Sequence, residues 1–193
     1  MNVLKHIFKE KITRRYVTLL KVSVHDAEDI YRWRTSKSGE FLHQPLNYSV
    51  ESQRKWITSR TGEEINYIIY RNDLMEKVGM VSIYEVNYED MVTNVGRLIL
   101  DEKYIHNKTP YGLESLLITY DYAFNTMGFR KITGVILGSN VKVYELQKYL
   151  GMTQEGYLKA HVMISDHFED LYIMSLFSDE FTGYSEKLKA LLR

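Results

Sequence analysis

The chain has 193 residues, with 25 basic and 25 acidic side chains and a formal net charge of zero. This balance creates no field that favours nucleic acid or an anionic membrane, so we expect neither as a partner. The composition, 45% hydrophobic and 26% charged, excludes the disordered and collagen-like classes. Because the sequence contains no cysteine, disulfides, thiol nucleophiles and cysteine-based zinc sites are excluded as well.

The N-terminal residues, the histidine spacing and the chain length indicate where the protein is located, whether it binds a metal and how its domain is bounded. Residues 1–8 are too short and too broken by Lys5 and His6 for a signal peptide, and no apolar run approaches the ~20 residues that span a bilayer. With no cysteine, these features favour a cytoplasmic protein. The six histidines lack metal-ligand spacing, so we expect no metal. We expect one domain over residues 16–178, an extension over residues 1–15 and a helical tail over residues 179–193.

The first half of the chain alternates a strand with two helices and then continues with three consecutive strands. Period-two alternation in YVTLLKVSV indicates a strand, and Asp26 and Ser49 are suited to cap the helices. The expected elements are a strand over Tyr16–Val24, a helix from His25–Asp26 to about Trp33 or Arg34, a polar loop over Ser36–Asn47, a helix from Ser49 to about Arg60, and strands over Asn66–Tyr70, Lys77–Tyr88 and Thr93–Leu100.

Helical spacing dominates the sequence after a polar loop at residues 104–111. Leu113, Leu116 and Tyr120 belong to an apolar series with the helical period, and Gly128 is suited to end that helix. The expected elements are a helix over Gly112–Met127, a strand over Lys131–Leu137, a short helix from Asn140 to Gly151, and a closing pair of strands over Met152–Ile164 and Phe168–Phe177. This succession predicts the α/β class.

The loop before the long helix is a candidate phosphate site. A helix N-terminus presents free backbone N–H groups and the positive end of the helix dipole. The sequence HNKTPYG leads into this end, where Lys108 adds charge and Thr109 a hydroxyl group. Because many strand-to-helix loops with a glycine share these features, the loop alone does not identify the ligand.

Four short sequence blocks occur in a fixed order in the second half of the chain. They are PYGLES at residues 110–115, YAF and MGFRKI within residues 122–132, NVKV, LGM and EGYLK within residues 140–159, and DLY and MSL within residues 170–176. The first resembles the G-Y-A/G-T-E-A stretch of ribosomal-protein N-terminal acetyltransferases, a branch of the GNAT superfamily. The others resemble the blocks that follow in that superfamily. Each block is common, but four in this order are specific, and the resemblance covers about residues 16–177.

The resemblance implies a fold and a cofactor site. The fold is the α/β (α+β) GNAT fold, whose mixed, mostly antiparallel sheet of about seven strands is flanked by helices and splayed at the cofactor cleft. Acetyl-CoA would serve as co-substrate in that cleft. The resemblance assigns its binding to the backbone of Leu98, Ile99 and Leu100 along the pantetheine arm, to the loop residues Lys108, Thr109, Tyr111, Gly112 and Leu113 at the pyrophosphate, and to Asn140.

The chain departs from the family pattern at the cofactor loop. Asn107 and Pro110 replace the first basic or amide residue and the first glycine, and proline removes one N–H donor.

It departs again at the acid and base positions. Gln147 stands where many members have a tyrosine acid, and Asn94 where some have a glutamate base. We take Glu85 as the candidate base, acting directly or through water, and Tyr144 as the candidate acid.

The expected acceptor site lies over the two N-terminal helices and their loop. The block from WRTS to QRKWI resembles GNAT members associated with bacterial surface polysaccharides, which acetylate nucleotide-linked amino sugars. Arg34 is suited to a bidentate phosphate contact and Trp33 to stacking on a sugar or base. With His43 and Gln44 in the loop, these residues form the expected substrate site.

Three functions remain open from the sequence. The first is acetyl transfer to a primary amine of a small polar acceptor, with a nucleotide-linked amino sugar as the leading choice. The second is acetylation of a protein N-terminus, and the third is a non-catalytic module that binds acyl-CoA or a partner. A basic, aromatic acceptor cleft favours the sugar nucleotide, whereas an acidic cleft favours the peptide. A strand edge near the C-terminus favours a homodimer.

Overall fold

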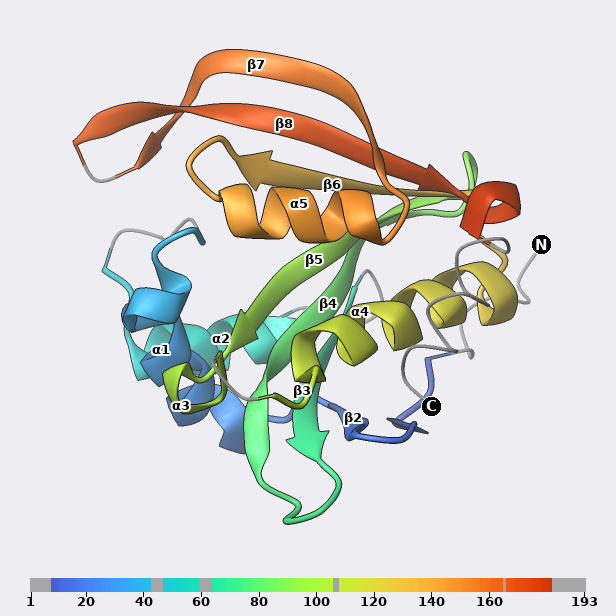
Figure 1. Cartoon of the computed structure of the whole chain (residues 1–193). Coiled ribbons are helices and arrows are strands. Elements are labelled where there is room, and N and C mark those ends of the chain that lie inside the picture. The colour runs from blue at the N-terminus through green and yellow to red at the C-terminus, as the bar shows by residue number, and fades with distance from the viewer. Residues whose placement is uncertain (1–7, 43–46, 60–63, 106–107, 165, 182–193) are drawn as a thin grey trace.

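A single eight-stranded sheet forms the centre of the computed structural model, which describes residues 8–42, 47–59, 64–105, 108–164 and 166–181 (Figure 1). The strand order is β1-β2-β3-β4-β5-β6-β8-β7, and only β5 and β6 run parallel. The strands are β1 Lys11–Thr13, β2 Val17–Lys21, β3 Ile65–Arg71, β4 Lys77–Asn87, β5 Val92–Leu100, β6 Lys131–Leu137, β7 Thr153–Ile164 and β8 His167–Phe177. The expected mixed, mostly antiparallel sheet is confirmed, with eight strands instead of about seven.

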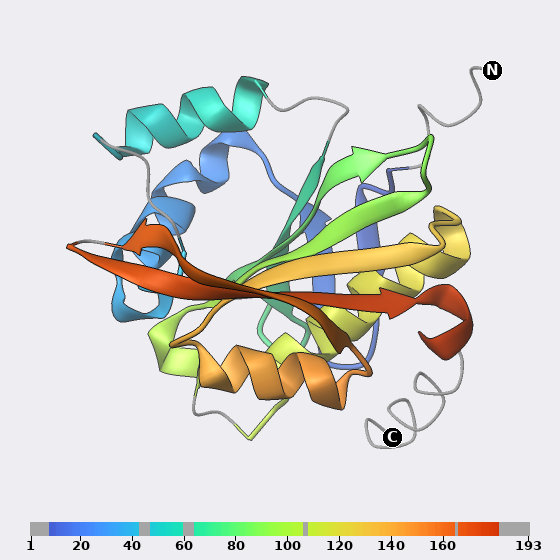
Figure 2. The ribbon, with the colours of Figure 1, turned by 90° about the horizontal axis from the view of Figure 1, so that it is seen from above.

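Helices cover both faces of the sheet, as the view from above shows (Figure 2). The helices are α1 Ala27–Thr35, α2 Val50–Ser59, α3 Glu102–Ile105, α4 Tyr111–Asp121 and α5 Val141–Tyr149. The first two lie together on one face, and α4 and α5 lie on the other. Among the described residues, none of the helices has the length and apolar character needed to cross a bilayer.

The long predicted helix is interrupted near its C-terminal end. After α4 the chain makes a π-helical turn over Tyr122–Thr126, in which the Met127 N–H donates to the Tyr122 carbonyl at 3.0 Å. Gly128 follows with φ of 77°, a left-handed conformation that suits glycine. The predicted stop at this glycine is confirmed.

Two apolar clusters fix the helices on the sheet. The larger one joins α4 and the sheet through fully buried residues such as Leu116, Tyr120 and Val81. The smaller one joins α1 to the opposite face and consists of Ile30, Trp33, Ile68, Met80 and Ile99. The sheet is therefore buried on both faces at its centre, which makes it a rigid support for the site.

The described parts of the expected N-terminal extension and C-terminal tail pack against the rest of the domain. β1 lies within the expected extension and pairs antiparallel with β2. At the other end, residues 178–181 are helical, and Phe181 is buried with its ring 5.1 Å from that of Phe124. Residues 182–193 of the expected helical tail lie outside the described residues. β7 forms an outer edge of the sheet, where the expected homodimer would pair.

The parallel pairing joins β5 and β6 only over their first residues. The register runs from Val92 opposite Lys131 to Asn94 opposite Thr133. Both strands continue beyond it, each still paired on its outer edge, β5 with β4 and β6 with β8. The two inner edges thus diverge, and the splay expected from the family resemblance is present.

Ion pairs hold α1 in place beside this divergence. Lys77 Nζ lies 2.7 Å from Asp26 Oδ1 and 2.8 Å from Asp29 Oδ2. Asp101, at the end of β5, accepts hydrogen bonds from Arg32 Nη1 at 2.6 Å and Trp33 Nε1 at 3.0 Å. Because Asp101 accepts hydrogen bonds from two consecutive residues of α1, it also fixes the direction of Arg34, the next residue in the helix.

Candidate active site

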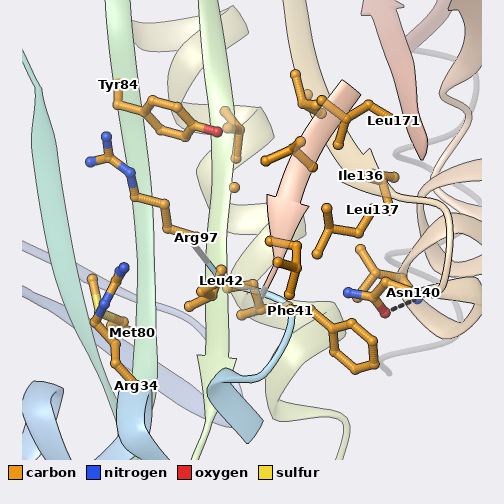
Figure 3. Close-up of a pocket in the computed structure, with 18 of the residues that line it drawn as sticks. Arg34, Phe41, Leu42, Met80, Tyr84, Arg97, Ile136, Leu137, Asn140 and Leu171 are labelled. Carbon is orange, nitrogen blue, oxygen red and sulfur yellow. Dashed lines mark hydrogen bonds between the residues drawn. The ribbon is translucent and has the colours of Figure 1, made fainter. Parts of the chain in front are cut away.

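A cavity of about 690 Å³ connects the diverging strands with the two N-terminal helices. Its lining includes Gly96, Leu98, Gly134 and Ile136 from the strands, Asn140 and Gln147 from the α5 side, and Arg34, Tyr48, Gln53 and Trp56 from the region of α1 and α2. Figure 3 shows Tyr84, Arg97 and Arg34 on one side of the pocket and Ile136, Leu137, Asn140 and Leu171 on the other. The cavity thus has a strand half and a helix half, and the strand half coincides with the predicted cofactor cleft.

A bulge in β5 shapes the strand half. Ser82 pairs with Gly96 and Met80 with Ile99, so that one residue of β4 faces two of β5. Arg97 lies in this bulge with φ of 51°, a left-handed conformation that is strained for arginine. The bulge turns the Arg97 side chain into the cavity, where strict strand alternation would not have placed it.

The three residues predicted to bind the pantetheine arm of acetyl-CoA lie at the C-terminal end of β5. Leu98 lines the cavity, whereas Ile99 is 2% exposed and packs in the smaller apolar cluster. A Cβ built on Gly112, in the first turn of α4, would lie 3.3 Å from Leu100 Cδ1 and 3.6 Å from Leu98 Cδ2. The absence of a side chain at Gly112 therefore lets α4 approach the end of β5 closely.

The predicted pyrophosphate cradle offers fewer backbone donors than a glycine loop. Pro110 has no N–H, and the Tyr111 N–H donates to the Thr109 carbonyl at 2.9 Å. The first helical bond runs from Glu114 N–H to the Pro110 carbonyl at 2.9 Å. The N–H groups of Gly112 and Leu113 lie in the turn before it, where a helix leaves its N–H groups for capping groups or ligands.

The predicted cofactor-binding side chains near this loop differ in their surroundings. Tyr111 is 3% exposed and packs edge-to-face on Tyr104, so the first turn of α4 supplies backbone and not this phenol. Lys108 is exposed. Asn107 lies outside the described residues. Asn140 caps α5 by accepting from Val143 N–H at 3.3 Å, and it also lines the cavity.

The helix half of the cavity is basic and aromatic. Arg34 Cζ lies 5.6 Å from the centre of the Tyr48 ring, and Arg97 Cζ lies 5.5 Å from that of Trp56 and 4.0 Å from that of Tyr84. Burial lowers the pKa of Arg34, and the nearby Arg97 lowers it further. The described lining contains these two cations and no carboxylate.

Of the four residues predicted to bind the acceptor, Arg34 is the one that the structure places in the lining. The stacking role of Trp33 needs correction, because this residue is 1% exposed and donates to Asp101 inside the smaller apolar cluster. Trp56 offers an aromatic surface to the cavity instead. His43 and Gln44 lie outside the described residues.

The two predicted catalytic side chains lie outside the lining. Tyr144 Oη donates to Gln154 Oε1 at 3.0 Å, and its ring packs 4.8 Å from that of Tyr172 on the hairpin β7–β8. Glu85 is exposed, and its carboxylate accepts a hydrogen bond from Asn94 Nδ2. Tyr144 is therefore not in contact with the cavity, and Glu85 would reach it only through water.

Two polar groups near the divergence do line the cavity. Tyr84 faces Gly96, whose added Cβ would lie 3.3 Å from the Tyr84 hydroxyl oxygen. Burial raises the pKa of Tyr84, although Arg97 opposes this shift, so the phenol keeps its proton at neutral pH. On the α5 side, Gln147 accepts a hydrogen bond from Tyr120 Oη and is 5% exposed.

Several residues that line the cavity were not predicted from the sequence, although the sequence pattern around two of them is unusual. Gln53 lies three residues after Val50 and three residues before Trp56. It is therefore a polar residue on the apolar face of the predicted helix. Arg97 is a charged residue inside the strand TNVGRLIL. Tyr48 and Tyr84 gave no comparable signal among the sixteen tyrosines.

Comparison with known proteins identifies the class of this fold and site. The family model described as "Acetyltransferase (GNAT) domain" matches residues 17–153. The chain belongs to this family. It is therefore an acyltransferase of the GNAT kind, and acetyl-CoA is the acyl donor of these enzymes. No curated protein matches the chain in sequence.

Solved structures are similar over nearly the whole chain. A putative acetyltransferase from T. thermophilus has a TM-score of 0.80 and 20% identity, covering 96% of this chain and 98% of its own. A GCN5-related N-acetyltransferase from Brucella melitensis has a TM-score of 0.81 and 14% identity, with coverages of 97% and 87%. The spermidine N-acetyltransferase of Vibrio cholerae, solved with CoA and spermine, has a TM-score of 0.78 and 16% identity, with coverages of 86% and 98%. These likenesses establish the fold.

Proposed function

We propose that the protein transfers an acetyl group from acetyl-CoA to a primary amine of a small polar acceptor, and that the acceptor is a nucleotide-linked amino sugar. The observation that carries this proposal is the continuity of the cavity from the diverging strands to a basic, aromatic half between α1 and α2. The first half suits the donor and the second half suits an anionic acceptor with a planar group.

The residues present fit acetyl-CoA in the strand half. When bound, acetyl-CoA supplies an activated acyl group as a thioester. The backbone of β5 beyond Asn94 offers an unpaired inner edge for the pantetheine amides, and Gly112 and Leu113 offer N–H groups at a helix N-terminus. Asn140 and Gln147 line the same half with amide groups. Each of these groups orients the donor by hydrogen bonding and requires no change of protonation.

Tyr84 is suited to position the acceptor amine. Its hydroxyl group lies over Gly96, at the boundary between the two halves of the cavity. Because burial keeps this phenol protonated, it orients an amine by hydrogen bonding and does not act as a base at neutral pH. Glu85 on the same strand stays our candidate base through water.

The acceptor half favours a sugar nucleotide over a peptide or a polyamine. Arg34 and Arg97 would repel a polycation such as spermine, and the described lining has no carboxylate to hold a peptide ammonium group. Tyr48 and Trp56 provide ring faces of the kind on which a nucleobase stacks.

Thermal unfolding with acetyl-CoA tests the donor site directly. Ligand at about 100 times its dissociation constant stabilises a protein by about 2.7 kcal/mol, so we expect a clear rise in Tm. The positive result justifies a screen of amine acceptors, with sugar nucleotides before peptides. No rise in Tm at millimolar acetyl-CoA would overturn the proposal and favour a module that binds a partner.

The pH dependence of transfer tests the proposed chemistry. The described lining has no carboxylate or histidine, and burial raises the pKa of Tyr48 to about 12. Among the groups in the cavity we therefore expect one ionisation, that of the acceptor amine, so kcat/KM should rise with pH as the amine loses its proton and then level off. Two acceptors whose amines differ in pKa should give curves displaced by that difference. Glu85, the candidate base through water, should add an acidic limb that is common to both acceptors and is lost in Glu85→Gln.

A further inference from the structure

We propose that Arg34, Gln53 and Arg97 form a phosphate-binding subsite in the helix half of the cavity. This inference rests on the proposed function, because it assigns the subsite to the diphosphate of a nucleotide-linked acceptor. All three residues line one cavity, although they come from α1, α2 and the bulge of β5. Arg34 and Arg97 are labelled on the same wall in Figure 3.

Gln53 supplies the observation that points to a ligand. Its side chain is 3% exposed, and its Oε1 atom accepts a hydrogen bond from Tyr48 Oη at 2.7 Å. This bond fixes the amide and directs its nitrogen, Nε2, which has no hydrogen-bond partner among the described residues. Buried amide nitrogens almost always have an acceptor, so an acceptor supplied by the ligand explains this one.

The two arginines supply the charge that selects an anion. Burial lowers the pKa of Arg34, and repulsion by Arg97 lowers it further, so a bound anion would offset the repulsion and stabilise the charged form of Arg34. Glu64 lies 3.1 Å from Arg97 Nη1 and is 7% exposed, but it lies outside the lining. It offsets one of the two positive charges, and the described lining stays net positive.

Aromatic rings hold the guanidinium groups and define the neighbouring space. The Arg97 group lies 4.0 Å from the ring centre of Tyr84 and 5.5 Å from that of Trp56, and the Arg34 group lies beside Tyr48. Planar packing pre-organises a guanidinium group, whose fork of N–H donors matches the geometry of a phosphate. Phosphate is favoured over a single carboxylate because three donor residues from separate elements line the same cavity, and a phosphate has enough oxygens to accept hydrogen bonds from all of them.

The experiment measures binding of pyrophosphate and of UDP by calorimetry to protein saturated with acetyl-CoA, so that the donor site is filled. We expect both probes to bind the wild-type protein. Gln53→Glu keeps the acceptor for Tyr48 but places a negative charge where the amide nitrogen lies. It should weaken UDP binding by about 10- to 100-fold, the range for a lost hydrogen bond to a charged group. Gln53→Met removes the amide donor together with the acceptor of Tyr48 Oη but adds no charge, so it should weaken UDP binding less.

A matched control is available on the surface. Gln154 is exposed and accepts a hydrogen bond from Tyr144 Oη at 3.0 Å, so Gln154→Glu makes the same change outside the cavity. It should leave UDP affinity, acetyl-CoA affinity and Tm unchanged. The Gln53 variants should also keep wild-type affinity for acetyl-CoA, which shows that they fold.

The outcomes separate this proposal from the function on which it rests. Equal UDP affinity in the wild type and both Gln53 variants, or no binding of either probe to the wild type, overturns the subsite. Pyrophosphate binding as tight as UDP binding retains the subsite and assigns it to phosphate alone, without a nucleoside. UDP binding that depends on Gln53, combined with no acetyl transfer to any amine, retains the subsite and overturns the proposed function.

Discussion

Replacing Gly134 by leucine is expected to weaken acetyl-CoA binding by about 100-fold while the protein stays folded. Gly134 is the first residue of β6 beyond its last pairing with β5, and it lines the cavity. A Cβ built there would lie 3.5 Å from the Val95 carbonyl oxygen, an ordinary contact. The longer leucine side chain would then occupy the space between the diverging strands. Titration calorimetry with acetyl-CoA measures the loss.

Gly134→Ala is the matched control for this variant. It adds only the Cβ that the structure accommodates, so acetyl-CoA affinity should change by less than about threefold, and circular dichroism should give the wild-type spectrum for both variants. Full affinity in a folded Gly134→Leu protein would show that the donor does not enter between β5 and β6.

The second large effect concerns stability. Asp101→Ala should lower the free energy of unfolding by about 3 kcal/mol, because it leaves the buried Trp33 N–H without an acceptor and removes one of the two carboxylate partners of Arg32. The Asp101 side chain is only 8% exposed. Urea denaturation followed by tryptophan fluorescence measures the change. Its slope with urea should stay constant if the variant unfolds in one step.

A surface pair provides the control for this effect. Asp73 binds Arg71 at 2.5 Å, but its side chain is 61% exposed, so Asp73→Ala should lower the free energy of unfolding much less than Asp101→Ala does. If both aspartate variants lose the same stability, the bonds that hold α1 to the sheet are no stronger than an exposed ion pair.

The sign of the pH dependence follows from the same contacts. Burial alone would raise the pKa of Asp101, but hydrogen bonds from Arg32, Trp33 and the Lys103 N–H outweigh it and lower the pKa. A carboxylate with a lowered pKa stabilises the fold above its unfolded value of about 3.9 and loses that contribution as the pH falls through the folded value. The difference between wild type and Asp101→Ala should therefore shrink below about pH 4.

The elements of the fold were predicted well because each has a clear period. The strand over residues 131–137 has the predicted bounds, and the helix after Ser49 and the stop at Gly128 agree closely. The π-helical turn and α3 were not predicted. The position of β8 between β6 and β7 was also not predicted, because periodicity identifies strands but does not specify their neighbours.

The site was harder to predict because it depends on a bulge that breaks strand alternation and on tertiary contacts that the periodicity of the sequence does not show. Strict alternation does not place Arg97 in the cavity; the bulge and its left-handed φ do. Trp33 was expected to stack on the acceptor, but a carboxylate at the end of a distant strand accepts its N–H. The Tyr144 side chain extends from α5 to the β7–β8 hairpin, where its ring packs against that of Tyr172. Each of these outcomes depends on a tertiary contact.

The position of β8 has a consequence for the order of assembly. The cavity lining extends along the chain from Ile30 to Leu171, and the last of these residues belongs to β8, which must insert between β6 and β7. Contacts so distant in sequence form slowly, since the closure entropy of a long loop is lost before any pairing compensates for it. Ligand affinity is therefore acquired late, when synthesis has passed β8 and the final hairpin has docked. A nascent chain that ends before β8 contains all the described lining residues except Leu171, but β6 lacks the strand that pairs with its outer edge.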